Sequence, residues 1–105
     1  MWIYYQGGWR GAAPDKKRPV LVLSRQEVIG LLPTVMVAPI TSTIRGAPSE
    51  VPLGEREGLK HPSAVNLDHV QTVEKSRLVG LIGHSGEATM RQVGRALAIA
   101  AGCDA

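Results

Sequence analysis

One stretch of the sequence joins an apolar segment to side chains that suit a phosphate group. The segment Val35–Ile40 is apolar, and Thr41, Ser42 and Thr43 follow it directly, with Arg45 close behind. Hydroxyls and a guanidinium donate hydrogen bonds to phosphate oxygens. A rigid apolar strand that carries such groups at its end is a common way to build a site. We therefore expect an anion-binding site where this strand ends.

A second candidate cation, Arg18, precedes another apolar segment, Pro19–Ser24. If the two segments form neighbouring strands, Arg18 and Thr41 meet. Such a pair can support RNA cleavage without a metal, because the 2′-hydroxyl of the substrate attacks its own phosphate. Arg18 would hold the phosphate and stabilise the charge of the transition state, and Thr41 would donate to a non-bridging oxygen.

One candidate proton acceptor for this reaction is His69, because an imidazole usually titrates near neutral pH. Arg18 is poorly suited to that role, since a guanidinium stays protonated in proteins. The alternative for His69 is a structural role, in which its ring is hydrogen-bonded to a neighbour at the rim of the sheet.

No familiar metal or nucleotide-binding pattern accompanies these residues. The histidines His61, His69 and His84 are scattered, without a cysteine partner or a histidine pair at helical spacing. The glycine-rich stretch at Gly7 lacks the Gly-Lys-Ser/Thr ending of a phosphate-binding loop, and the sequence has no Gly-x-Ser-x-Gly elbow. We therefore expect neither a bound metal nor another cofactor.

The composition is that of a small globular protein with a mild positive charge. The 105 residues fit one domain, expected to span 1–105, with 44% hydrophobic and 20% charged residues. The formal net charge of +3 favours an anionic partner. The single cysteine, Cys103, fits a reducing compartment, and no segment resembles a signal peptide or a membrane span. We therefore expect a cytoplasmic protein.

Apolar periodicity and the turn residues between apolar segments predict a mainly β chain with one C-terminal helix. The expected strands are Trp2–Gln6, Pro19–Ser24, Thr34–Thr41, Ser49–Leu53, Ser63–Val73 and Arg77–Gly83. We expect Ser85 to cap the helix and Gly102 to follow its last residue. Four residues form the expected apolar stripe of the helix: Met90, Val93, Leu97 and Ala101. Early strands and one late helix indicate a small, strongly bent sheet or SH3-like barrel.

The loop between the first two strands, Gly7–Lys17, is rich in glycine and basic residues. Trp9 in this loop can stack on a base, while Lys17 and the neighbouring cations can hold phosphates. The alternative is that Trp9 packs over the edge of the barrel.

Three motifs, in the same order along the chain, resemble those of the MazF/PemK family of toxin endoribonucleases, the toxins of type II toxin–antitoxin pairs. Lys17–Arg25 is similar to the family's Arg-Pro-Val strand. The second motif is Val37–Gly46 followed by Ser49–Val51, and the third is Ser63–Val73 followed by Lys75–Leu78. The resemblance covers most of the chain.

The resemblance implies an SH3-like barrel of the MazF/PemK/CcdB type that forms a homodimer. It implies metal-independent, sequence-selective cleavage of single-stranded RNA and neutralisation by a cognate MazE-like antitoxin. The family's catalytic pair falls on Arg18 and Thr41. With the polar and basic residues described above, the expected RNA contacts are Trp9, Lys17, Ser42, Thr43, Arg45, Asn66 and Gln71.

Two other interpretations stay open. A non-catalytic toxin of the same fold would bind a protein target such as gyrase, and it would need a specialised surface on the C-terminal helix rather than Arg18 and Thr41. A small RNA-binding module would bind RNA without turnover. Incubation with a long single-stranded RNA in EDTA separates these possibilities.

Overall fold

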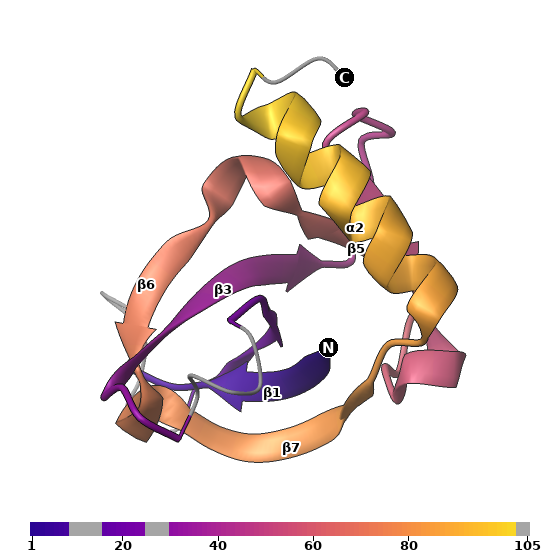
Figure 1. The fold of residues 1–105 in the computed structure, drawn as a ribbon. Helices are drawn as coiled ribbons and strands as arrows, with labels where there is room; N and C mark the ends of the chain where they lie inside the picture. Colours follow the sequence, from indigo (N-terminus) through magenta and orange to yellow (C-terminus); the bar gives the residue numbers. More distant parts are fainter. Residues whose placement is uncertain (9–15, 25–29, 103–105) are drawn as a thin grey trace.

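A computed structural model describes residues 1–8, 16–24 and 30–102, which form a strongly curved sheet with a helix across one end (Figure 1). The described elements are β1 (Trp2–Gln6), β2 (Arg18–Val22), β3 (Thr34–Thr41), β4 (Glu50–Leu53), the 3₁₀ helix η1 (Glu55–Glu57), β5 (Ser63–Asn66), the 3₁₀ helix η2 (Leu67–His69), β6 (Gln71–Glu74), the 3₁₀ helix η3 (Lys75–Arg77), β7 (Leu78–His84) and the α-helix α2 (Glu87–Ala100). The predicted fold class, mainly β with a C-terminal helix, is confirmed. Trp9 and Cys103 lie outside the described residues.

The described strands pair antiparallel in the order β4-β5-β3-β2-β1-β7, and β6 pairs with β3. The long strand β3 is shared between two partners on one side. Its first half, Thr34–Val37, pairs with β6, and its end, Ile40–Thr41, pairs with β5. Because β6 does not pair with β7 among these strands, the curl of the barrel is not closed by hydrogen bonds.

The prediction of one strand over Ser63–Val73 is wrong, because the chain bends at η2. The Asn66 side-chain oxygen accepts a hydrogen bond from the Asp68 backbone nitrogen at 2.8 Å, a local bond that competes with strand pairing. Ser49, which directly precedes β4, stabilises the bend through two hydrogen bonds. Its carbonyl oxygen accepts from the Leu67 nitrogen at 2.9 Å, and its hydroxyl donates to the Asp68 carboxylate. The bend lets β5 and β6 pair with different parts of β3.

Buried aliphatic side chains lie on both faces of the central strands. One cluster joins the sheet to α2: Ile3, Leu21, Ala38, Ile40, Val51, Leu53, Leu59, Val65, Leu67, and Val93 and Ala96 of the helix itself. A smaller cluster lies on the other face: Val20, Val22, Val35 and Val37. Since β2 contributes to both clusters, the prediction that its apolar run is covered on both faces is confirmed.

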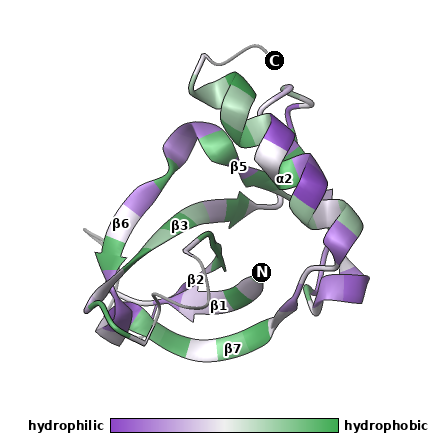
Figure 2. Cartoon of the chain, viewed as in Figure 1, coloured by the Kyte–Doolittle hydropathy of each residue, from purple (hydrophilic) through white to green (hydrophobic). Residues whose placement is uncertain are grey.

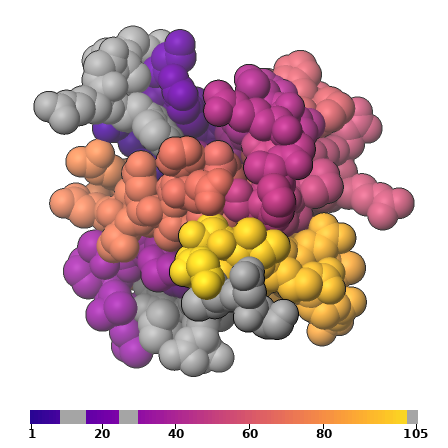
Figure 3. Space-filling view, turned by 90° about the horizontal axis from the view of Figure 1, so that it is seen from above, coloured from indigo at the N-terminus to yellow at the C-terminus, as the bar shows by residue number. Residues whose placement is uncertain are grey.

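Helix α2 packs against β4 and η2, and its C-terminal part lies across the middle of the face seen in Figure 3. Hydrophobic and hydrophilic residues alternate along it (Figure 2), as expected for a helix with one covered face. The predicted stripe is partly wrong. Val93 and Leu97 do pack against the core, but Met90 is 40% exposed and Ala101 is exposed. Ala96 and Ala100 take their place.

The prediction that Ser85 caps α2 is also wrong. The N-cap is Gly86, which has no side chain to cap with. Ser85 is buried, and its nitrogen donates to the Met1 carbonyl oxygen at 2.9 Å, so it joins the end of β7 to the start of β1. At the other end, Gly102 has φ +76° and donates to the Ile99 carbonyl at 3.0 Å, which confirms it as the residue that ends the helix. None of the described helices is long and apolar enough to cross a membrane.

Candidate active site

The pairing of β2 with β3 brings Arg18 and Thr41 to the same end of the sheet. Val20 pairs with Pro39 in an antiparallel register. Arg18 lies two residues before Val20, and Thr41 lies two residues after Pro39. Continuing the register therefore places Arg18 opposite Thr41, with both side chains on one face of the sheet.

A pocket of about 330 Å³ lies at this end of the sheet. We call it the Arg18–Thr41 pocket. The ends of β1, β2 and β3 and the loop between η1 and β5 line it: Tyr5, Arg18, Pro19, Ile40, Thr41, Ser42, Leu59, Lys60, His61 and Ser63. Arg18 and Lys60 are exposed cations, and Thr41 and Ser42 carry hydroxyls. The pocket thus combines positive charge with hydrogen-bond donors, which suits a phosphate.

The turn that follows β3 orients the Thr41 hydroxyl. Its oxygen accepts a hydrogen bond from the Thr43 backbone nitrogen at 3.1 Å. Because a hydroxyl accepts through its lone pairs and keeps one proton to donate, this bond leaves the proton available. Thr41 is half-buried, whereas Ser42 is exposed. The local geometry therefore suits Thr41 to donate to an oxygen of a bound anion.

Glu50 holds the loop that follows this turn, and sequence reasoning missed its role. Its Oε1 atom accepts from three backbone nitrogens, those of Arg45 at 3.1 Å, Gly46 at 2.8 Å and Ala47 at 3.2 Å. Gly46 has φ +73°, which favours glycine. The available signal was an acidic residue just after a glycine-containing turn, a position from which a carboxylate can reach backbone nitrogens.

Three of the predicted RNA contacts line neither the Arg18–Thr41 pocket nor the two pockets described in the next paragraph. Thr43 and Arg45 are exposed in the loop after β3. Asn66 is the N-cap residue of η2, and its side-chain oxygen is engaged by the Asp68 nitrogen, so the structure gives it a role in the bend. A fourth, Trp9, lies outside the described residues.

Two further predicted contacts, Gln71 and Lys17, line two other pockets, which share Gly8 and Arg77. The larger, of about 710 Å³, is lined by Gln6, Gly8, Gln71, Thr72, Val73, Glu74 and Arg77. The other, of about 450 Å³, is lined by Gly7, Gly8, Lys16, Lys17, Ser76, Arg77 and Val79. Polar and basic groups therefore continue beyond the Arg18–Thr41 pocket.

Arg77 lines both of these pockets. It was not predicted as a site residue, although it lies in Lys75–Leu78, the last part of the third family motif. Its Nη1 atom donates to the Gly8 carbonyl at 3.0 Å, and its own carbonyl accepts from the Gly7 nitrogen at 2.9 Å. On the other side, the Lys17 Nζ atom lies 4.6 Å from the centre of the Tyr5 ring, a cation–π contact. Since Tyr5 lines the Arg18–Thr41 pocket, this contact places Lys17 beside it.

One histidine, His61, lines the Arg18–Thr41 pocket. His69, the candidate proton acceptor named from the sequence, lies in η2 and does not line it. Sequence reasoning passed over His61 because three scattered histidines show no spacing that distinguishes one from another. Only the path of the loop between η1 and β5 shows which histidine reaches the site.

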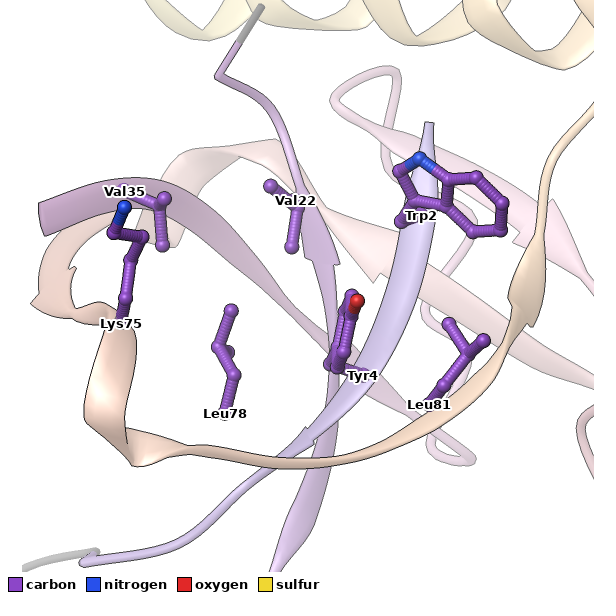
Figure 4. Close-up of a pocket in the computed structure, with 7 residues that line it drawn as sticks. All are labelled: Trp2, Tyr4, Val22, Val35, Lys75, Leu78 and Leu81. Carbon is purple, nitrogen blue, oxygen red and sulfur yellow. The ribbon is translucent and has the colours of Figure 1, made fainter. Parts of the chain in front are cut away.

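A further pocket, of about 420 Å³ and largely apolar, lies inside the curl of the sheet (Figure 4). Its lining is mostly aromatic and aliphatic: Trp2, Tyr4, Val22, Val35, Lys75, Leu78 and Leu81. Lys75 is the only charged group among these lining residues. This pocket does not contain Arg18 or Thr41, and its surface does not suit a phosphate.

The part of the chain that the structure describes contains no group of three or more His, Cys, Asp or Glu side chains that could hold a metal ion. The Arg18–Thr41 pocket is lined instead by cations, hydroxyls and an imidazole. Hard cations such as Mg²⁺ prefer carboxylate oxygens, so this donor set suits an anion better than a metal ion.

Comparisons with known proteins find related sequences and structures over most of the chain. Residues 2–101 match the family described as PemK-like, MazF-like toxin of type II toxin–antitoxin system. The chain is 42% identical over 96 residues to the probable endoribonuclease MazF5 of Mycobacterium tuberculosis (strain ATCC 25618 / H37Rv), covering 90% of this chain and 88% of that protein.

Two solved structures are similar over nearly the whole chain. The Mycobacterium tuberculosis toxin MazF-mt6 has a TM-score of 0.89 and 35% identity, with 100% of each chain covered. An endoribonuclease from a mycobacterial species, solved in complex with its cognate antitoxin, has a TM-score of 0.84 and 27% identity, covering 99% of this chain and 94% of that one.

Proposed function

Because this chain belongs to the PemK-like, MazF-like toxins of type II toxin–antitoxin systems, we propose that it is an endoribonuclease that cleaves single-stranded RNA in the Arg18–Thr41 pocket. The observation that carries this proposal is the meeting of a cation and an oriented hydroxyl in one pocket. Relatives named as endoribonucleases support it.

The pocket supplies what attack by a 2′-hydroxyl requires. The 2′-oxygen bonds to the adjacent phosphorus while the bond to the 5′-oxygen breaks, leaving a 2′,3′-cyclic phosphate and a 5′-hydroxyl. Arg18 faces the non-bridging oxygens through two N–H groups and stabilises the negative charge that grows on them. Thr41 donates its free hydroxyl proton to one of the same oxygens. Both residues thus act most strongly on the transition state.

The reaction proceeds without a metal ion. Arg18 and Lys60 supply the positive charge at the pocket, and its described lining includes no carboxylate to bind a divalent cation. Supplying charge by side chains is sufficient here, because the nucleophile belongs to the substrate and needs no metal-bound water.

The RNA continues from the pocket along Lys17, Lys16 and Arg77. These cations line one pocket, and the adjoining one adds the amide of the exposed residue Gln71. Cations contact the phosphates without regard to sequence, whereas amides can read base edges. We therefore place backbone contacts at the lysines and Arg77, and base selection at Gln71 together with the loop that holds Trp9.

The partners of the protein follow from the same surface and from its family. A cognate antitoxin of the MazE type carries an acidic segment that covers the basic pockets and blocks RNA, as charge complementarity favours. A related endoribonuclease has been solved with its antitoxin.

The toxin forms a homodimer in the cytoplasm. Val79 and Leu81 on β7, the last strand in the sheet order, are each 57% exposed, and pairing of two copies would remove such apolar surface from water.

The test is cleavage of a long single-stranded RNA by the purified protein in EDTA, with fragment ends mapped. We expect discrete fragments with 2′,3′-cyclic phosphate and 5′-hydroxyl ends. A single 2′-deoxynucleotide placed at a mapped site should block cleavage at that site alone. RNA that stays intact with and without EDTA would contradict an endoribonuclease and favour a binding module or a toxin of a protein target.

A further inference from the structure

We propose that His61 accepts the proton of the attacking 2′-hydroxyl. This role rests on the RNA cleavage proposed above. The residue lies on the loop between η1 and β5 and lines the Arg18–Thr41 pocket together with Arg18 and Thr41. A phosphate held by Arg18 and Thr41 therefore lies in the same pocket as an imidazole.

Two neighbours of His61 fix the ends of its loop. On one side Leu59 is 8% exposed in the main core, and its nitrogen donates to the Gly54 carbonyl at 3.2 Å. On the other side Ser63 begins β5, pairs with Leu53 and donates its hydroxyl to the His61 carbonyl at 3.0 Å. Because residues on both sides of His61 are buried, the backbone at His61 has little freedom. A proton-transfer group needs such a fixed position.

A close approach of backbones holds the start of the same loop. Gly58 has φ +93°, and a Cβ atom there would lie 2.6 Å from the Ile82 carbonyl oxygen of β7. Gly83 approaches from the other side, because a Cβ atom there would overlap the Glu57 carbonyl oxygen. Two glycines thus let η1 sit directly on β7. This contact fixes the segment that precedes the loop of His61 against the sheet.

The chemistry of the pocket leaves one suitable proton acceptor. The other charged and titratable groups that line this pocket are Tyr5 of β1, Arg18 of β2 and Lys60 of the same loop as His61. Guanidinium, ammonium and phenol side chains ordinarily hold their protons at neutral pH, and the hydroxyls of threonine and serine do not accept one readily. Imidazole is the side chain that ordinarily exchanges a proton between about pH 5 and 8.

Neutral His61 takes the 2′-hydroxyl proton through a ring nitrogen while the 2′-oxygen bonds to phosphorus. The bond from phosphorus to the 5′-oxygen breaks, and the 5′-oxygen takes a proton from solvent. The imidazolium then returns its proton to solvent, so the enzyme ends the cycle unchanged.

The experiment measures single-turnover cleavage of a short RNA that carries a mapped site, from pH 5 to 9. The variant is His61→Gln, which keeps a hydrogen-bonding side chain but cannot exchange a proton in this range. We expect a loss of about 10²- to 10⁴-fold at neutral pH and disappearance of the rise in rate on the acid side. His84→Gln is the matched control, since this exposed histidine contacts Trp2 and does not line the pocket. It should keep the native profile.

A second variant keeps the test decisive if His61→Gln is poorly folded. In His61→Ala, added free imidazole should restore part of the cleavage, and it should not do so in Arg18→Ala. Native rate and native pH profile in His61→Gln would overturn this role while RNA cleavage stands. Loss of the basic side of the profile instead would make His61 the proton donor, also against the proposal. The same profile change in His69→Gln would move the role to His69. If the native protein leaves all RNA intact, the proposed function itself fails.

Discussion

Arg18 and Thr41 occupy opposing positions at the open end of the β2–β3 pair, so a change at either residue acts on the same pocket. Neither residue contributes to the buried core. This separation of the site from the core means that activity and stability can be tested independently.

Arg18→Ala should lower the RNA cleavage rate by about 10²- to 10³-fold, because it removes donors aimed at the charge of the transition state. Arg18→Lys should recover only part of the loss, since an ammonium cannot replace the two-pronged guanidinium. The free energy of unfolding should change by less than about 1 kcal/mol at this exposed position. Rates from single-turnover cleavage and unfolding curves in urea test both statements. An Arg18→Ala protein that is folded and fully active would refute the assignment.

Thr41→Val should also lower cleavage, by about 10²-fold, because valine keeps the branched shape but has no hydroxyl to donate. It also removes the acceptor for the Thr43 nitrogen, which should cost about 1 kcal/mol of stability at most. Thr41→Ser retains both hydrogen bonds and is the matched control. Equal activity of the valine and serine variants would show that the hydroxyl has no part in the reaction.

Glu50→Ala should destabilise the protein by about 1 to 3 kcal/mol, because the Arg45, Gly46 and Ala47 nitrogens lose a shared carboxylate acceptor. Glu50→Gln, which keeps an oxygen but no charge, should lie between this variant and the native protein. Urea denaturation measures the effect. Glu55→Ala removes a carboxylate from exposed η1 and should leave stability near its native value. A Glu50→Ala protein no less stable than Glu55→Ala would argue against this anchor.

Alanine at two glycines should have opposite effects. Gly83→Ala places a methyl group on the Glu57 carbonyl and forces η1 away from β7. We therefore expect poor folding, or a fall of several kcal/mol in the free energy of unfolding. Gly94→Ala meets nothing within 4 Å and lies inside α2, where alanine should add about 0.5 to 1 kcal/mol. The Tm of each variant, measured by thermal unfolding, tests both expectations. Equal changes of Tm in the two variants would contradict the close approach of η1 and β7.

Arg77→Gln should weaken RNA binding and make it less sensitive to salt. If Arg77 contacts one phosphate of a single strand, the slope of log affinity against log salt should fall in magnitude by about 0.7. An RNA with a 2′-deoxynucleotide at the cleavage site allows binding to be measured without turnover. Arg91→Gln, on the exposed side of α2, is the control for the loss of one charge. The same change of slope in both variants would indicate a nonspecific charge effect rather than a contact at Arg77.

Residue types and their local pattern were sufficient to predict most of the strands, the C-terminal helix and the chemical character of the site. The apolar run of β2 and the segment that ends in Thr41 specify strands through their residue types, and the motifs around them name the family. Arg18, Thr41 and Ser42, which line the pocket, could be selected from the sequence in the same way. Local pattern was sufficient there because strand formation and charge depend on residues near each other in the chain.

Features that depend on residues far apart in the chain appear only once the chain has folded. The pairing of distant strands shows that Arg18 stands opposite Thr41, and the loop between η1 and β5 brings His61 to the same pocket. The expected strand over Ser63–Val73 bends at a local hydrogen bond from the Asp68 nitrogen to Asn66 and at a distant one, in which Ser49 donates to the Asp68 carboxylate. Alternation of residue types cannot reveal such long-range hydrogen bonds and backbone contacts, because they arise only once the sheet has curled.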